Sequence, residues 1–161
     1  RHPRANASID MEREEMTLHG AVNLSIAIDA PDGLVTPVVR DADRKPAPVI
    51  GAEIAALAYA ARERKLTPEQ FTGGTITVNN FGALGSPFST PIIPVGQAIN
   101  LGLGRIEERP LAIEGEVVVR PVLGISCSGD HRILDGADLS RFVNDIVATV
   151  ADPLRLLAVL A

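Results

Sequence analysis

The sequence has few of the residues on which several classes of protein depend. Its single cysteine, Cys127, rules out an internal disulfide framework and suits a reducing compartment. Aromatic residues make up 3% of the chain and tryptophan is absent, so few side chains are available to stack on nucleic-acid bases. The net charge is -5 and no basic tract is present, and we therefore expect no nucleic-acid partner.

Long hydrophobic runs are also missing. No uninterrupted apolar stretch reaches the roughly 20 residues that a membrane-spanning helix needs, and no signal segment opens the chain. We expect no membrane partner and a cytoplasmic location, in a bacterium in preference to the mitochondrial matrix of a eukaryote. The sequence starts at Arg1 and not at Met, which leads us to expect a piece of a longer protein.

The residues that are abundant are aliphatic. Hydrophobic residues make up 46% of the chain, and the mean hydropathy is +0.19. A chain of 161 residues fits one domain with a real core. A monomer of this composition would leave apolar surface exposed to water, and we expect that surface to be buried against other subunits.

The hydrophobic pattern alternates between strand-like and helix-like segments. Alternation over 17–40 with a turn at 31–33 predicts two strands, and helical spacing predicts an amphipathic helix over 49–65. Further strands are predicted in 75–82, 98–106 and 114–129, and a helix from Leu139 to Val150 that Asp152 and Pro153 end. This order predicts an α/β layer structure with a mixed sheet, and a parallel Rossmann sheet fits it poorly.

A polar cluster follows the last predicted strand, where the next helix begins. Asp130, His131, Arg132 and Asp135 lie together in the segment CSGDHRILDGADLSRF. Histidine is the side chain best suited to move a proton at neutral pH, and an aspartate often orients such a ring. The alternative is structural: Asp135 caps the helix, Gly136 relieves the turn, and His131 is a satisfied polar group. The residues alone leave both readings open.

The same cluster could also serve a metal site or nucleophilic hydrolysis. A metal could use Cys127, Asp130, His131 and Asp135, but no second histidine or cysteine lies nearby, and we predict no metal site. Hydrolysis by a serine or cysteine nucleophile is disfavoured, because no G-x-S-x-G segment exists. Cys127 also alternates toward the apolar side of its strand, where thiols are usually structural.

The segment DHRILDG followed by ADLSRF resembles the terminal motif of the dihydrolipoyl acyltransferase components of 2-oxo acid dehydrogenase complexes. Distant relatives of that family include chloramphenicol acetyltransferase. Segments in 23–45, 66–85, 90–106 and 114–126 follow the family's order and spacing. The resemblance implies a chloramphenicol-acetyltransferase-like α+β sandwich that forms trimers. It also implies one catalytic domain over residues 1–161 that lacks its N-terminal part, without lipoyl or subunit-binding domains.

The implied reaction is transfer of an acyl group from a dihydrolipoyl thioester to coenzyme A. His131 matches the family's general base, and Asp135 matches a second motif acid that keeps ion pairs and the histidine in place. Asn79 falls where many members carry a serine that stabilises the oxyanion, and an amide can also donate that hydrogen bond. The alternative is that Asn79 only shapes the turn with Asn80. Arg132 matches a structural position that ties the loop down.

The resemblance also implies binding residues. Those beside the coenzyme A channel are Asp29, Asn79, Asn80, Gly104 and Ile106. Each has a plainer alternative, with Asp29 and Gly104 as strand-end turn residues and Ile106 as part of the core. Gly129 matches the small residue of branched-chain members, and we predict that it leaves room in the acyl pocket, which favours a branched acyl group.

The family assembles trimers into cores of 24 or 60 subunits, together with decarboxylase and dihydrolipoamide dehydrogenase components. The lipoyl group is then carried on a domain absent from this chain. Alternatives are a catalytically inactive structural core subunit and an acetyl- or succinyl-specific transferase. A free-standing acetyltransferase of the chloramphenicol type is disfavoured, because that motif has an additional histidine where this chain has Asp130.

Overall fold

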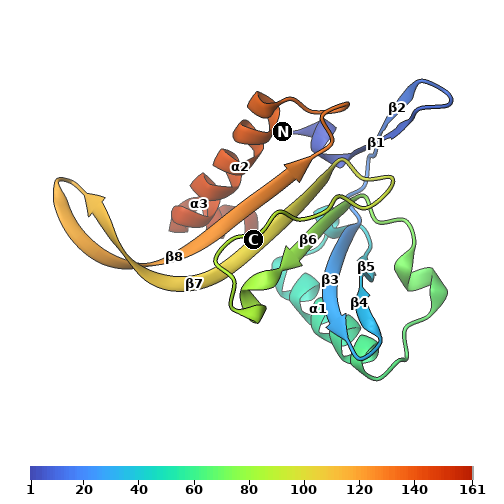
Figure 1. The fold of residues 1–161 in the computed structure, drawn as a ribbon, viewed down its shortest axis with the longest axis horizontal. Helices are drawn as coiled ribbons and strands as arrows, with labels where there is room; N and C mark the ends of the chain where they lie inside the picture. The colour runs from blue at the N-terminus through green and yellow to red at the C-terminus, as the bar shows by residue number, and fades with distance from the viewer. Residues whose placement is uncertain (161) are drawn as a thin grey trace.

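The computed structural model describes residues 1–160 (Figure 1). The strands are β1 (Ala7–Asp10), β2 (Glu15–Leu18), β3 (Leu24–Ala30), β4 (Gly33–Val35), β5 (Val38–Val39), β6 (Ile76–Asn80), β7 (Ile99–Ile113) and β8 (Glu116–Gly129). The α-helices are α1 (Ala47–Arg62), α2 (Gly136–Ala151) and α3 (Pro153–Leu160). Short 3-10 helices include η1 (Pro3–Asn6) and η4 (Phe81–Leu84).

One six-stranded sheet organises the molecule. Its order is β4-β3-β6-β7-β8, with β5 also paired to β3, and β1 and β2 form a separate two-stranded ribbon. The β3–β6 and β6–β7 pairs are parallel, whereas β7 and β8 are antiparallel. The predicted mixed sheet and α/β class are therefore confirmed.

The two faces of the sheet differ in chemistry. Paired residues point to the same face, and successive residues alternate. One row across the strands, in register from β3 to β8, is Leu24, Ile76, Ile99 and Gly129. The neighbouring row, on the opposite face, is Ser25, Thr77, Asn100 and Ser128. The sheet thus has one apolar face and one polar face.

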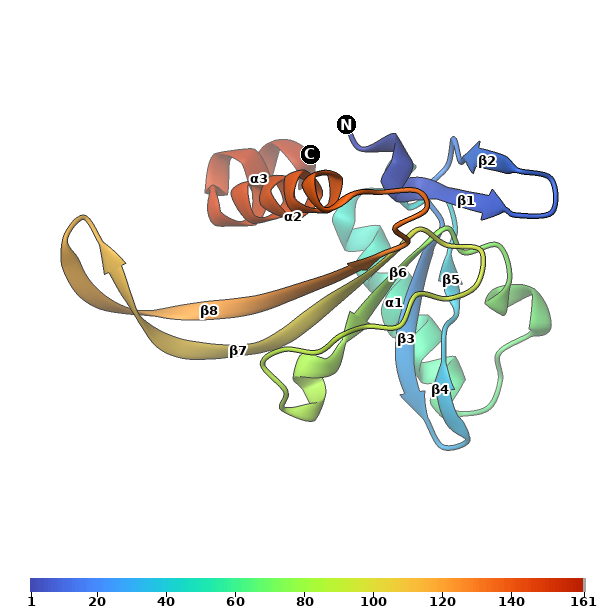
Figure 2. The same cartoon turned by 45° about the horizontal axis from the view of Figure 1, so that its top comes forward.

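The helices cover the apolar face, as Figure 2 shows for α2 and α3. Helix α1 packs on β3, because Ile50, Ile54, Leu57 and Ala61 recur at helical spacing and join the cluster around Ile28 and Val39. Helix α2 contacts β8 at the other side of the sheet. The predicted two-layer arrangement of helices on a sheet is confirmed.

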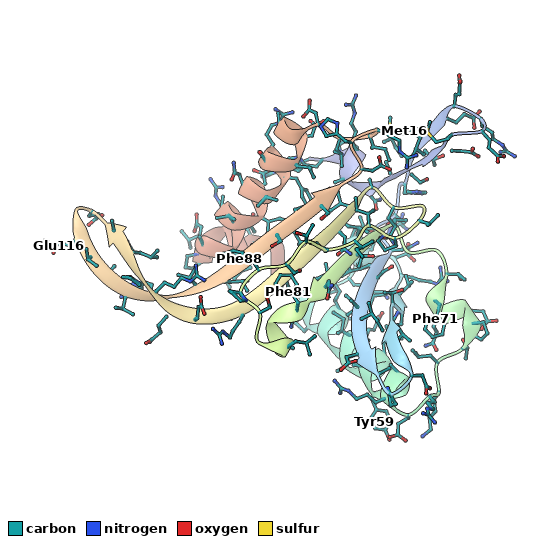
Figure 3. The ribbon with its side chains drawn as sticks, in the orientation of Figure 1. Met16, Tyr59, Phe71, Phe81, Phe88 and Glu116 are labelled. Carbon is teal, nitrogen blue, oxygen red and sulfur yellow. The ribbon has the colours of Figure 1, made fainter. Side chains whose placement is uncertain are left out.

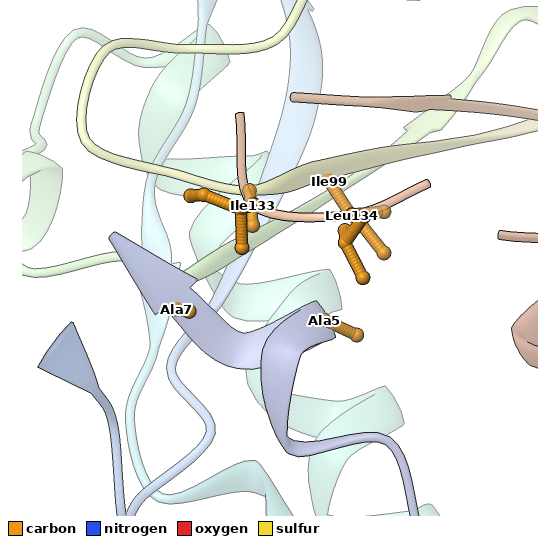
Figure 4. Close-up of a cluster of buried hydrophobic side chains, with 6 residues drawn as sticks. Ala5, Ala7, Ile99, Ile133 and Leu134 are labelled. Carbon is orange, nitrogen blue, oxygen red and sulfur yellow. The ribbon is translucent and has the colours of Figure 1, made fainter. Parts of the chain in front are cut away.

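A second apolar cluster anchors the chain between β8 and α2. Ile133 and Leu134 are 5% and 3% exposed and pack with Ala5, Ala7 and Ile99 (Figure 4). Burying two large aliphatic side chains contributes roughly 1.5–3 kcal/mol each. The turn that carries the polar cluster is therefore fixed to η1, to β1 and to the start of β7.

The polar face of the sheet is covered by the segment that follows β6. The ring of Phe81 lies where a side chain on Gly102 would point, and Phe88 lies against Gly124 (Figure 3). At Gly104 the backbone of Pro87 comes so close that a Cβ atom would collide with its carbonyl oxygen. The β7–β8 register shifts at this point, between Leu103 and Ile106.

Replacing Gly104 by alanine tests this close approach. The added methyl group meets backbone atoms that cannot rotate away, so the strand or the covering segment has to move. We expect Gly104→Ala to lower the free energy of unfolding by about 1–3 kcal/mol. Gly136→Ala is the matched control, because no atom lies near its Cβ position. Equal denaturation midpoints for the two variants would contradict the packing described.

Three features were not predicted, and the first is the ribbon formed by β1 and β2. Strands β7 and β8 continue past β6 as a two-stranded arm, from the Ile106–Leu123 pair to the turn before Glu116 (Figure 1). Val117 on this arm is 76% exposed. The chain also forms α3 after the predicted end of the last helix at Pro153. Between residues 17 and 40, the prediction of two strands is incomplete, since β3 is followed by the short strands β4 and β5.

No helix within residues 1–160 combines the length and the apolar character that crossing a membrane would require.

Candidate active site

His131 lies on a braced turn between β8 and α2. The amide of Asp130 donates to the carbonyl of Ala98 at 2.8 Å, and the carbonyl of Asp130 accepts from the amides of Ile133 and Leu134. His131 is exposed, and no hydrogen bond joins its ring to another residue in the described chain. The turn therefore presents the imidazole outward on a rigid support, where a reactant from outside the chain can reach it.

Asp130 and Arg132 brace the same turn. The Asp130 carboxylate accepts from the Arg132 amide at 3.0 Å and from the guanidinium Nη2 at 2.6 Å. The side-chain hydrogen bond from Arg132 holds the pKa of Asp130 below its ordinary value. The carboxylate raises the pKa of Arg132 in return. Both partners lie inside the turn, so the role predicted for Arg132 in tying the loop to its surroundings stays a prediction.

Asp135 caps helix α2. Its Oδ1 accepts from the amide of Asp138 at 2.7 Å, and the Asp138 carboxylate reaches back to the Asp135 amide at 3.5 Å. This is the capping arrangement weighed as the structural alternative. In the described residues Asp135 makes no hydrogen bond to His131. Its role in keeping the histidine in place stays a prediction.

Asn79 lies on the polar face of the sheet. It pairs with Ala27 of β3 and Gly102 of β7, one row beyond Thr77, and it is half-buried. Its position is fixed by parallel strands on both sides, which hold the backbone of β6 in the centre of the sheet. Across the part of the chain that is described, no hydrogen bond is made by its amide. The amide is thus free to donate to a ligand.

Within one chain, Asn79 and His131 are far apart. The row that contains Asn79 ends on β8 at Ser126, three residues before Gly129, and two strand spacings separate β6 from β8. At about 3.3 Å per residue and 4.8 Å per strand, Asn79 lies roughly 14 Å from Gly129. His131 is two residues further on, beyond the end of the strand. The structure does not bring these two predicted catalytic residues together in a single chain.

The predicted coenzyme A residues lie toward the same end of the sheet as Asn79. Asn80 ends β6 and pairs with Leu103, the residue before Gly104. Asp29 is exposed near the end of β3, where the hairpin to β4 begins. Ile106 is 66% exposed, so its alternative as part of the core is wrong. Gly104 lies in the middle of β7 and not at a strand end, and the approach of Pro87 gives it a packing role.

Gly129 faces the helices. Its Cβ direction points at Leu139 of α2, whose Cδ2 would lie 2.6 Å from the added atom. Leu139 fills the space left by the missing side chain. That space lies on the face of the sheet opposite to Asn79. The placement of Gly129 in an acyl pocket stays a prediction. Within one chain, however, Gly129 leaves no free space for an acyl group.

Cys127 lies on the helical face, packed against the cluster around Ile99. Burial raises the pKa of its thiol to about 11. A thiol in this state is almost wholly protonated at neutral pH and is a poor nucleophile. The predicted placement of Cys127 on the apolar side of its strand is confirmed, and its purely structural role stays a prediction.

The low reactivity of the Cys127 thiol can be measured. We expect a maleimide to label native Cys127 far more slowly than free cysteine at pH 8, with the rate rising as pH approaches 11. Unfolding in guanidinium should restore the ordinary rate.

Two other histidines of the described chain lie beside cavities, His19 with a hydrogen bond to Ser8 and His2 with one to Asp145. Among residues 1–160 no group of three or more histidine, cysteine, aspartate or glutamate side chains is placed to hold a metal ion. A cavity of about 780 Å³ lies between the β1–β2 ribbon and residues 73–75, and neither His131 nor Asn79 lines it.

Comparisons with known proteins place the chain in a family. The family described as "2-oxoacid dehydrogenases acyltransferase (catalytic domain)" matches residues 1–158. A relative is the dihydrolipoyllysine-residue succinyltransferase component of the 2-oxoglutarate dehydrogenase complex of Haemophilus influenzae, 45% identical over 157 residues, which are 98% of this chain and 38% of that protein. The lipoamide acyltransferase component of the branched-chain alpha-keto acid dehydrogenase complex of Pseudomonas putida is 38% identical over 151 residues, 94% of this chain and 36% of that one.

Solved structures show the same architecture. The dihydrolipoamide acetyltransferase of Azotobacter vinelandii superposes with a TM-score of 0.91 at 32% identity, covering 99% of this chain and 64% of that one. The cubic core of a pyruvate dehydrogenase multienzyme complex gives a TM-score of 0.91 at 31% identity, covering 99% and 65%. The chain belongs to the family of 2-oxoacid dehydrogenase acyltransferase catalytic domains, and it spans just over a third of the length of the curated relatives named above.

Proposed function

We propose that the protein containing this chain transfers an acyl group from a dihydrolipoyl thioester to coenzyme A, at sites formed between neighbouring copies of the chain. One observation carries the proposal: His131 and Asn79 are both placed for chemistry, yet lie at different ends of the sheet in one chain. A second copy brings the two together if the His131 turn of one copy faces the polar sheet face of the next.

The surface of the single chain supports such an assembly. Apolar side chains are exposed on the β7–β8 arm and on the segment before β7, among them Val117, Phe88, Ile92 and Val95. Exposed apolar area of this extent marks a contact surface. A related structure is the cubic core of a pyruvate dehydrogenase complex. We propose a trimer repeated into a 24- or 60-subunit core that works with decarboxylase and dihydrolipoamide dehydrogenase components in the cytoplasm of a bacterium.

The reaction needs one proton carrier. His131 removes the proton from the thiol of coenzyme A, and the sulfur attacks the thioester carbonyl. The tetrahedral oxyanion accepts a hydrogen bond from the Asn79 amide of the neighbouring copy. When the intermediate collapses, the bond to the dihydrolipoyl sulfur breaks, and that sulfur takes the proton from His131. The histidine returns to its starting form, so the proton balance closes.

Positioning supplies most of the rate. In water, transfer of a proton from a thiol to an imidazole is uphill by about 2.7 kcal/mol. Holding two reactants in line supplies roughly 7–11 kcal/mol. The rigid turn around His131 and the central strand under Asn79 are suited to that task.

The Azotobacter enzyme supports these residue roles. The roles of a serine, a histidine and an asparagine in its catalytic mechanism have been investigated. Those residues are separated along that chain by the same numbers of residues as Asn79, His131 and Asp135. Two of the three differ here, since asparagine stands for the serine and aspartate for the asparagine. The histidine alone is shared, which fits its role as the proton carrier.

The acyl group is the finer question. The relatives named above comprise succinyl-, acetyl- and branched-chain transferring complexes, and the sequence argument for a branched chain was the small Gly129. Because Leu139 fills the space at Gly129, a branched-chain preference needs a pocket completed by another copy of the chain. We therefore propose the reaction itself, and the preference for a branched acyl group is left to the assay below.

An assay of the full-length protein tests the function. Coenzyme A is mixed with acetyl, succinyl and isobutyryl thioesters of dihydrolipoamide, and the acylated coenzyme A is measured. We expect transfer from at least one donor, with the highest kcat/KM for isobutyryl if the branched-chain preference holds. Higher kcat/KM for succinyl or acetyl would remove that preference, and no transfer from any donor by an assembled core would leave a structural subunit.

A further inference from the structure

We infer that Gln97 is a positioning residue for His131, acting through a buried hydrogen-bonded chain that crosses the sheet. This inference rests on the proposed function only for its kinetic readout. The contacts that support it belong to the fold, and a second measurement tests them without any assay of acyl transfer.

Gln97 is buried and joins two strands. Its Oε1 accepts from the Thr77 hydroxyl at 2.6 Å, and its Nε2 donates to the Ser25 hydroxyl at 3.2 Å. Gln97, Thr77 and Ser25 are each at most 8% exposed. Gly74 leaves room for them, because a side chain there would collide with the Ser25 hydroxyl. Buried polar groups that satisfy one another in this way hold a single arrangement.

The link to the catalytic turn is short. Gln97 comes directly before Ala98, whose carbonyl accepts the amide of Asp130, and Asp130 comes directly before His131. Ala98 lies outside the first β7–β8 pair, which joins Ile99 to Gly129. Ala98 is held by packing in the cluster around Ile133, and the side chain of Gln97 anchors the backbone on its other side.

The network also lies on the polar face of the sheet, the face that carries Asn79. Ser25 and Thr77 belong to the polar row that ends on β8 at Ser128, two residues before Asp130. Asn100, in the same row, donates from Nδ2 to the carbonyl of Ile92 at 2.6 Å and so ties down the segment that leads to Gln97. Hydrogen bonds of the polar row therefore hold the chain both before and after Ala98, the residue that bonds to the turn.

The kinetic test uses the full-length protein. We expect Gln97→Leu to lower kcat about 10- to 100-fold, with KM for coenzyme A unchanged, because a small displacement of a catalytic group costs this much. Thr77→Val should lower kcat to a similar extent, and the double variant should lose no more than the larger single loss, because both remove one link. Thr77→Ser keeps the hydroxyl and should keep kcat.

A matched control separates positioning from loss of stability. Leu57→Ala removes a buried side chain from the cluster under α1, which shares no residue with the cluster around Ile133. It should lower the thermal midpoint at least as much as Gln97→Leu and leave the kcat of the folded protein unchanged. If Leu57→Ala lowers kcat equally, the effect of Gln97 is general instability and the inference is wrong.

Hydrogen exchange gives a readout independent of activity. In Gln97→Leu and Thr77→Val, we expect the amide of Asp130 to exchange at least 10-fold faster, measured by mass spectrometry on peptides that span residues 128–134. Thr77→Ser and Leu57→Ala should exchange as the unmodified protein does. Unchanged exchange in Gln97→Leu would overturn the inference even if acyl transfer is present. Faster exchange in a protein that transfers no acyl group would support the link and refute the proposed function instead.

Discussion

His131→Ala in the full-length protein is expected to lower acyl transfer by about 10²- to 10⁴-fold, the usual contribution of a general acid–base group. The imidazole is exposed and makes no hydrogen bond in the described chain, so folding and assembly should be unaffected. The measurement is kcat with a saturating dihydrolipoyl thioester, together with sedimentation of the core. The loss of kcat should appear in a core of unchanged size.

A second histidine provides the matched control. The ring of His19 lies 3.1 Å from the Ser8 hydroxyl, beside the β1–β2 ribbon, and has no hydrogen bond to the turn in the described residues. His19→Ala should retain kcat within a few-fold of the unmodified protein. Near-normal turnover by His131→Ala would remove the histidine from the mechanism and leave the turn a structural feature.

Asn79→Ala is expected to lower kcat by about 10²- to 10³-fold, with little change in KM for coenzyme A. The reason is that an oxyanion donor acts on the transition state and not on the bound substrates. Asn79 is half-buried and makes no hydrogen bond within the described residues, so its truncation should change the free energy of unfolding only slightly. Steady-state kinetics of the assembled core give both parameters.

Serine at this position supplies the rescue. Asn79→Ser supplies a hydroxyl donor, the kind of side chain that the Azotobacter enzyme has at the same spacing from its histidine, and it should recover most of the kcat lost in Asn79→Ala. If both variants turn over at the rate of the unmodified protein, Asn79 is only a residue of strand β6 and has no part in the chemistry.

Much of the fold was readable from the sequence because the pattern obeys simple periodicities. The spacing of Ile50, Ile54 and Leu57 predicted α1, and alternation predicted the strands that pair in the sheet. The arm of β7 and β8 was not predicted, since Ile106 and Val117 look in sequence like core residues. Local spacing cannot show that the strand beside them stops at Asn80.

The sequence proposes residues for the site, but it does not show their geometry. The motif around His131 marks the turn, but nothing in the sequence shows that Asn79 lies at the other end of the sheet. The Gly129 argument assumed an open space, and the side chain that fills it, Leu139, lies ten residues away on a helix. Gln97 was missed because a glutamine in a proline-rich segment shows its buried partners only after folding.

The most direct measurement mixes two inactive proteins. His131→Ala chains keep Asn79, and Asn79→Ala chains keep His131, so neither core should turn over appreciably alone. In trimers assembled from equal amounts of both, about a quarter of the shared sites receive the intact residue from each neighbour. We predict that mixed cores recover about a quarter of normal turnover. Mixed cores no more active than the average of their parents would show that each chain works alone.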